Sequence, residues 1–161
     1  MRDAIEKRLR RAQRWVSEHR WSVALTLVVA LFFLLRQSPV RAASVEEIMT
    51  AIWEVESGGS LNPPDGDGGR AIGPFQIHEI YWKDAVAADP SLGPEAGYRY
   101  RDCRDPDYAR RVIEAYMKRW IPEAWARCDA ETIARTHNGG PKGAQKTATD
   151  RYWKLVRAEL D

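Results

Sequence analysis

Residues 44–59 read SVEEIMTAIWEVESGG, and this stretch predicts the first helix of a helical domain. Ser44, followed three residues later by Glu47, forms a capping box that satisfies free backbone N–H groups at a helix start. The adjacent glycines Gly58 and Gly59 are typical of a helix end. At about 100° per residue, the apolar side chains fall on one inward face. That face contains Val45, Ile48, Met49, Ile52, Trp53 and Val55.

One acidic residue interrupts this apolar face. Glu56 lies near the middle of the inward stripe, whereas Glu54 points to solvent. A carboxyl group among apolar side chains is costly to ionise, so we expect the pKa of Glu56 to be raised. A carboxyl group that stays protonated near neutral pH can act as a general acid. The alternative is a helix-end glutamate that turns out to water or caps a neighbouring turn.

The first 43 of the 161 residues are predicted to be separate from the folded domain. A basic start precedes an uncharged, mostly apolar run at residues 21–35, which would reach about 22 Å as a helix, short of a ~30 Å bilayer core. With small residues at 40–42, this pattern predicts a secretory signal peptide. An uncleaved membrane anchor through residues 21–35 remains an alternative, whereas a buried core helix is disfavoured. In either case we expect export to the periplasm or the extracellular space.

The overall charge of +2 divides unevenly along the chain. Residues 1–43 carry nine Lys/Arg against three Asp/Glu, and residues 44–161 carry 16 against 20. The basic excess therefore belongs to the leader and gives no reason to expect nucleic-acid binding. The remaining residues suffice for one domain, 44–161. Its two cysteines, Cys103 and Cys128, are a candidate disulfide and too few for a metal site, so we expect neither metal nor cofactor.

The rest of the pattern predicts a mainly α domain. The glycine-rich stretch 58–73 is expected to be a loop or short hairpin. Gly73 and Pro74 are expected to start a second helix with Phe75, Ile77, Ile80, Tyr81 and Trp82 as its apolar residues. Residues 88–104 are expected to be irregular. Further helices are expected over 105–120, from Asp129 to 137, and over 147–160, the last burying Tyr152, Leu155 and Val156.

A second carboxylate is expected in the glycine-rich loop that follows Glu56. Hydrolysis of a sugar bond commonly needs a protonated acid and a negative charge on the other side. Asp65 and Asp67 both qualify, because glycines allow close approach to a ligand and a wet loop favours an ionised carboxylate. We favour Asp67 over Asp65. The alternative is that these Asp-Gly pairs only form turns.

Several short blocks occur in a recognisable order. They are Glu56-Ser57-Gly58, Gly73-Pro74-Phe75-Gln76-Ile77, Tyr81-Trp82, Ala115-Tyr116-Met117-Lys118-Arg119, the block from Ala134 to Gly143 around His137-Asn138-Gly139-Gly140-Pro141, and Tyr152-Trp153. Together they resemble the invertebrate-type lysozyme (destabilase) family, within the lysozyme-like and lytic transglycosylase superfamily. The similarity extends over about residues 48–157.

This resemblance implies a lysozyme-like α+β domain that cleaves the β-1,4 bond between N-acetylmuramic acid and N-acetylglucosamine in peptidoglycan. It assigns the acid to Glu56 and places the second carboxylate near Gly66, at Asp67 or alternatively Asp65. The substrate contacts that it implies are Gln76, the stretch Ile77-His78-Glu79-Ile80-Tyr81-Trp82, and His137-Asn138-Gly139. The family is typically rich in disulfides, whereas Gly59 and Ile72 stand where cysteines would be expected.

Alternatives to the muramidase hypothesis remain at this point. A lytic transglycosylase would use Glu56 alone and let the sugar's own 6-hydroxyl displace the bond. A non-catalytic cell-wall-binding module would keep only the fold. Some relatives are thought to cleave isopeptide bonds with a serine, but nothing in the spacing singles out Ser57 or Ser60. His137 either caps a helix C-terminus as a cation or lies in the cleft, where Asn138 would contact a sugar acetamido group.

Overall fold

The computed structural model describes residues 5–8, 10 and 43–161. The chain divides into two units, residues 1–41 and 42–161. In the first unit, residues 5–8 are helical and Arg10 forms an ion pair with Glu6 at 3.3 Å. The predicted signal or anchor run 21–35 lies outside the described residues. Within the described part of the chain, no helix is both long and apolar enough to cross a bilayer.

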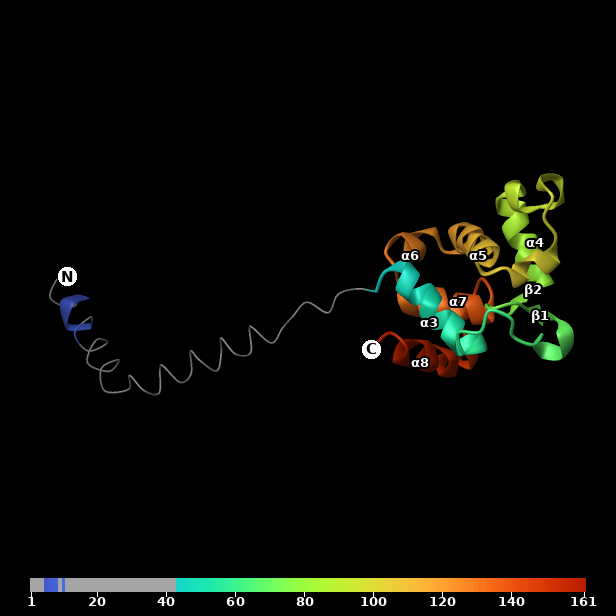
Figure 1. Cartoon of the computed structure of the whole chain (residues 1–161). Helices are drawn as coiled ribbons and strands as arrows, with labels where there is room; N and C mark the ends of the chain where they lie inside the picture. The colour runs from blue at the N-terminus through green and yellow to red at the C-terminus, as the bar shows by residue number, and fades with distance from the viewer. Residues whose placement is uncertain (1–4, 9, 11–42) are drawn as a thin grey trace. The chain divides into compact units, whose positions relative to one another are not determined.

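The second unit is mainly helical with one small antiparallel hairpin, as predicted (Figure 1). Its α-helices are α3 (Val45–Ser57), α4 (Glu79–Ala88), α5 (Pro106–Trp120), α6 (Pro122–Ala126), α7 (Ala130–Gly139) and α8 (Asp150–Ala158). Its strands are β1 (Ala71–Ile72) and β2 (Ile77–His78). Short 3-10 turns connect them: η1 (Asp67–Gly69), η2 (Pro90–Leu92), η3 (Pro94–Ala96), η4 (Tyr100–Arg104), η5 (Gly143–Gln145) and η6 (Thr147–Thr149).

Helix α3 begins and ends as its sequence predicts. The Ser44 hydroxyl accepts a hydrogen bond from the Glu47 main-chain N–H at 3.3 Å, and the Glu47 carboxylate accepts one from the Ser44 N–H at 2.7 Å. Gly58 ends the helix with φ +60°, a left-handed conformation that favours glycine. Ile48 and Ile52 are fully buried, whereas Glu54 is exposed. The inward face of the helix is therefore the predicted one.

The second helix does not begin at Gly73-Pro74, so this prediction is wrong. Residues 73–76 form a turn between β1 and β2, and α4 begins only at Glu79. Gly73 and Gln76 have φ values of +73° and +47°, which an α-helix does not allow. A Cβ at Gly73 would lie 2.1 Å from the Cys103 carbonyl oxygen, so packing requires glycine here. Ile80, expected to be buried, is 68 % exposed.

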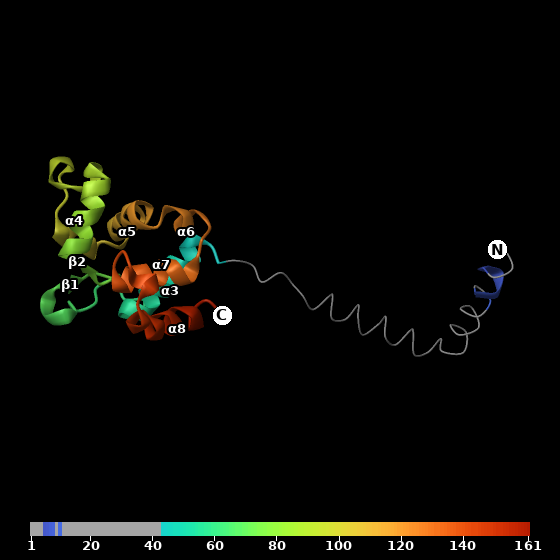
Figure 2. The ribbon, with the colours of Figure 1, turned by 180° about the vertical axis from the view of Figure 1, so that it is seen from behind.

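Helix α5 lies between two groups of elements in this unit. The hairpin and α4 lie at one end, and α3, α7 and α8 lie at the other (Figure 1, Figure 2). Helix α5 packs against α4, α6 and α7, and its buried residues form much of the core. Tyr152 and Val156 of α8 are buried as predicted, but Leu155 is 49 % exposed. Leu155 is adjacent to Val156, about 100° around the helix from it, and so leaves the i, i+4 stripe.

The predicted disulfide is absent, because Cys103 and Cys128 are both free thiols. Cys103 lies in η4, just before α5, and Cys128 follows α6, beyond the opposite end of α5. The 15 residues of α5 span about 22 Å, whereas a disulfide requires Cα atoms within about 7 Å. Burial raises the pKa of the Cys103 thiol to about 12, so this group is an inert core residue.

Candidate active site

Glu56 lies in the last turn of α3 with its side chain only 17 % exposed. Burial raises the pKa of its carboxyl group to about 7, the direction expected from its place on the apolar face. The side chain does not turn out to solvent. It is therefore partly protonated near neutral pH, which a proton donor to a leaving group requires.

Tyr152 of α8 is the hydrogen-bond partner of this carboxyl group. Its hydroxyl donates to Oε1 of Glu56 at 2.7 Å. This bond favours the charged carboxylate and so lowers the pKa of Glu56, against the larger effect of burial. The periodicity of α8 predicted Tyr152 only as a core residue. The Tyr152-Trp153 block was the one sequence signal for a role in the site.

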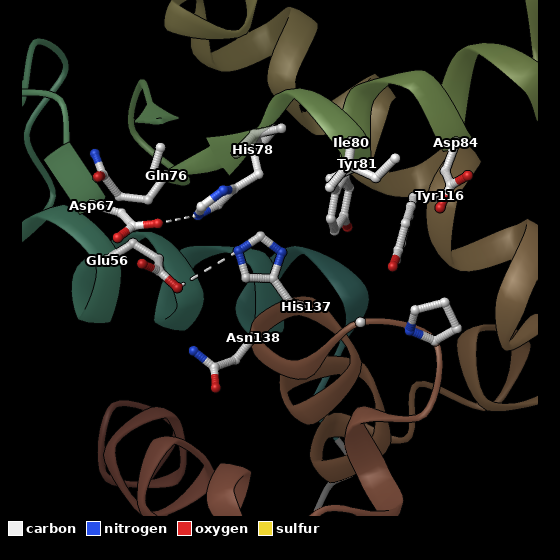
Figure 3. Close-up of a pocket in the computed structure, with 14 residues that line it drawn as sticks. Glu56, Asp67, Gln76, His78, Ile80, Tyr81, Asp84, Tyr116, His137 and Asn138 are labelled. Atoms are coloured by element: carbon white, nitrogen blue, oxygen red, sulfur yellow. Dashed lines mark ion pairs between the residues drawn. The ribbon is translucent and has the colours of Figure 1, made fainter. Parts of the chain in front are cut away.

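His137 of α7 also lies next to the Glu56 carboxyl group (Figure 3). Its Nε2 is 3.1 Å from the Phe75 carbonyl oxygen and 3.7 Å from Oε1 of Glu56. Burial lowers the pKa of His137 to about 4, so the ring is neutral at neutral pH and Nε2–H donates to Phe75. A neutral ring is not the cationic helix cap considered above. His137 instead forms part of the cavity wall.

The two candidate aspartates occupy different places. Asp67, in η1, lines the same cavity as Glu56 and forms ion pairs with Arg70 at 2.7 Å and His78 at 3.6 Å. Figure 3 shows Asp67 beside Glu56 at one end of the cavity. Asp65 does not line the cavity and forms an ion pair with Arg104 at 2.6 Å. The structure therefore places Asp67, the favoured candidate, next to Glu56.

The cavity has a volume of about 470 Å³. Among the predicted substrate contacts, its lining includes Gln76, Ile77, His78, Tyr81, His137 and Asn138. Trp82 is not part of it, because its indole points into the core and donates to the Tyr108 hydroxyl at 2.8 Å. Gly139 is also outside it. Lys146 donates to the Gly139 carbonyl, and the Thr149 methyl group would lie 2.6 Å from a Cβ at this glycine.

Sequence reasoning missed the other end of the cavity. The lining residues absent from the predicted set are Ala71, Asp84, Tyr116, Gly140 and Pro141, whereas Ile80 of the predicted stretch 77–82 also lines the cavity. Tyr116, Gly140 and Pro141 stand within the similarity blocks, which was a usable signal, but Asp84 stands in none. Among residues 5–8, 10 and 43–161, no group of three or more His, Cys, Asp or Glu side chains is placed to hold a metal ion.

Comparison with known proteins agrees with this geometry. The Destabilase family model matches residues 46–158, which is most of the chain. The chain belongs to the invertebrate-type lysozyme (destabilase) family. It is 34 % identical to a lysozyme of Ostrea edulis over 139 residues, covering 84 % of this chain and 94 % of that protein.

Solved lysozyme structures show the same fold. The structure is similar to that of Tapes japonica lysozyme with a TM-score of 0.57 and 29 % identity, over 72 % of this chain and 92 % of that one. It is also similar to the inhibitor-bound lysozyme of Meretrix lusoria, with a TM-score of 0.56 and 30 % identity, over 71 % of this chain and 89 % of that one. The lysozyme-like fold expected from the destabilase resemblance is thus confirmed.

The destabilase-family blocks, far apart in sequence, meet around Glu56. The Glu56-Ser57-Gly58 block ends α3, and the turn before β2 supplies Gln76 and the Phe75 carbonyl that accepts from His137. The last turn of α7 contributes His137 and Asn138. With both cysteines free, this member of the destabilase family is held together by core packing and hydrogen bonds rather than by a disulfide in residues 43–161.

Proposed function

We propose that this chain is a muramidase that hydrolyses the β-1,4 bond between N-acetylmuramic acid and N-acetylglucosamine, with Glu56 as general acid. The observation that carries this proposal is the shielded Glu56 carboxyl group, with a pKa of about 7, beside Asp67 in one cavity. The lysozyme relatives support the same activity, and the chain is accordingly a lysozyme-type glycoside hydrolase.

The contacts of Glu56 suggest which of its oxygens donates the proton. Oε1 already accepts the Tyr152 hydrogen bond at 2.7 Å and is the oxygen next to His137. The acidic proton is therefore expected on Oε2, which has no such contact within residues 43–161, and Oε2 would protonate the leaving glycosidic oxygen. The neutral His137 ring, bonded to Phe75, excludes water from one side and does not compete for this proton.

Asp67 is the proposed second carboxylate. Its side chain is 48 % exposed, and the neighbouring Arg70 and His78 hold it by hydrogen-bonded or ionic contacts. In this role it stabilises or captures the oxocarbenium-like sugar while the Glu56–Oε2 proton moves to the leaving group. Water then enters, deprotonated by Glu56, and the anomeric configuration is retained.

The test is hydrolysis of purified peptidoglycan by the full chain, followed by turbidity and by mass spectrometry of the products. We expect clearing of the suspension and products with reducing ends. Glu56→Gln should abolish clearing, whereas the matched control Glu54→Gln, on the exposed face of the same helix, should not. Products lighter by one water would instead identify a lytic transglycosylase. Binding without clearing would identify a non-catalytic wall-binding module.

We further propose that residues 1–43 direct export to the periplasm or the extracellular space. The basic start, the short apolar run 21–35 and the small-residue exit support this proposal. Cell fractionation and sequencing of the mature N-terminus test it. A new N-terminus near residue 43 would indicate a cleaved signal peptide, and an intact chain in the membrane fraction an anchor. Recovery of the intact chain in the cytosol would contradict export.

A further inference from the structure

The end of the cavity farthest from Glu56 and Asp67 contains a second polar pair. Asp84 extends from α4 and Tyr116 from α5, and both line the cavity. Figure 3 shows this pair at the opposite end from Glu56, with Tyr81 and His137 in between. A substrate chain that places a glycosidic bond at Glu56 therefore has room to present another of its groups to Asp84 and Tyr116.

Among the acidic residues that line this cavity, Asp84 is the one whose carboxylate has no ion pair or hydrogen bond within residues 43–161. Glu56 accepts a hydrogen bond from Tyr152, and Asp67 is paired with Arg70 and His78. Arg119 approaches Asp84, but its guanidinium donates to the main-chain oxygen at 3.0 Å and lies over the Trp120 ring. Within residues 43–161, no Lys, Arg or His forms an ion pair with the Asp84 side chain, and no Lys or Arg lines the cavity.

The Tyr116 hydroxyl is a second free acceptor beside this carboxylate. The Tyr116 ring is held by stacking on Tyr81, with 3.6 Å between ring centroids. Within residues 43–161, its hydroxyl forms no hydrogen bond. Burial and the charge of Asp84 raise the pKa of Tyr116 to about 12, so the hydroxyl is neutral at neutral pH. A partly exposed carboxylate and a fixed hydroxyl together offer acceptors and negative charge to a ligand.

We propose that Asp84 and Tyr116 form a subsite for a primary ammonium group carried by the peptidoglycan substrate. An ammonium group has three donors and a positive charge, which match a carboxylate and a hydroxyl acceptor. The ammonium has two possible sources: an N-deacetylated hexosamine of the glycan, or the side-chain amine of a diamino acid in the stem peptide. This proposal rests on the proposed muramidase function, because the subsite lies in the same cavity.

The test compares kcat/KM on two pairs of substrates. The first pair is peptide-free glycan, either fully N-acetylated or partly deacetylated. The second pair is fully N-acetylated peptidoglycan whose stem amines are either free or acetylated. On the pair that carries the relevant amine, we expect the wild-type chain to favour the free amine about three-fold, the size of one partly exposed ion pair. Asp84→Asn should bring that ratio to about one, and Tyr116→Phe should reduce it in part.

Glu95→Gln is the matched control, because it removes one negative charge from an exposed residue of η3 outside the cavity. It should keep the wild-type preference. Equal wild-type rates on the free and blocked members of both pairs would overturn the ammonium subsite and leave the muramidase assignment intact. A preference that persists in Asp84→Asn would also overturn it. Failure to hydrolyse any of the four substrates would overturn the proposed function as well.

Discussion

The Tyr152 hydroxyl donates to Oε1 of Glu56 at 2.7 Å, although 96 residues separate the two along the chain. The bond connects α8 to the last turn of α3, and it is one of two opposing effects on the pKa of this carboxyl group. Burial raises the pKa of Glu56, and the hydrogen bond from Tyr152 lowers it, with burial the larger effect. The resulting pKa of about 7 is the property on which the proposed acid catalysis depends.

Replacing Tyr152 by phenylalanine should change the pH dependence of catalysis. Without the hydrogen bond, the pKa of Glu56 rises, so the alkaline limb of the kcat/KM profile should move to higher pH. The rate at the optimum should fall about ten-fold, because the carboxyl group loses an orienting contact. Tyr98→Phe is the control, because it removes a hydroxyl that accepts a hydrogen bond from Arg111 and neither residue lines the cavity. An unshifted alkaline limb in Tyr152→Phe would contradict this role.

Glu56→Gln should stabilise the fold at alkaline pH. The pKa of Glu56 rises from 4.5 to about 7 on folding, so the folded state binds the extra proton between these values. The stability that this proton contributes is complete below pH 4.5 and is lost as pH rises through 7. A shift of this size corresponds to about 3 kcal/mol at most. In urea unfolding, the free energy of unfolding of Glu56→Gln should increase relative to that of the wild-type chain as the pH rises from 4 to 8. A difference in unfolding free energy that does not change with pH would contradict this prediction.

His137 should contribute a pH dependence of opposite sign. Its pKa falls from 6.5 to about 4 on folding, so the unfolded state binds more protons between these values. The stability from the neutral ring is therefore complete above pH 6.5 and is lost as pH falls through 4. The Glu56 carboxyl group has a pH dependence of opposite sign, so the measurement is made in Glu56→Gln. There the free energy of unfolding should rise with pH between about 4 and 6.5. His137→Gln should remove that slope, and a slope unchanged by this substitution would argue against a buried neutral ring.

Substitution of the two aspartates of the glycine-rich loop should have different effects on kcat. Asp67→Asn is expected to lower kcat about 100-fold with little change in the free energy of unfolding, because Asp67 lines the cavity beside Glu56. Asp65→Asn should leave kcat unchanged and cost less than about 1 kcal/mol, since its ion pair with Arg104 is partly solvent-exposed. Steady-state kinetics and urea unfolding on both variants measure this. The reverse pattern would transfer the role to Asp65.

Trp82 should behave as a core residue rather than a substrate contact. Trp82→Phe removes the hydrogen bond to the Tyr108 hydroxyl and leaves space in the core. We expect the free energy of unfolding to fall by about 1–3 kcal/mol with KM unchanged. Tyr81, which lines the cavity, is the comparison, and Tyr81→Leu should raise KM. A raised KM in a stable Trp82→Phe variant would restore the contact that the family resemblance implied.

The sequence alone determined the features that depend on neighbouring residues. The Ser44–Glu47 capping box and the 3.6-residue apolar period placed α3 and turned Glu56 inward, because these signals act within one or two helical turns. The aspartate caps of α5 and α7, at Asp105 and Asp129, were readable for the same reason. The similarity blocks then identified the family.

Only the tertiary structure decided which distant groups meet. The start of α4 was mispredicted because the turn at Gly73 depends on its packing against the Cys103 carbonyl. The choice of Asp67 over Asp65 depends on Arg104, 39 residues away from Asp65, and the partner of Glu56 comes from the last helix. Asp84 joins the cavity because α4 packs on α5. Local periodicity sets the direction of a side chain, whereas packing between remote segments sets what it touches.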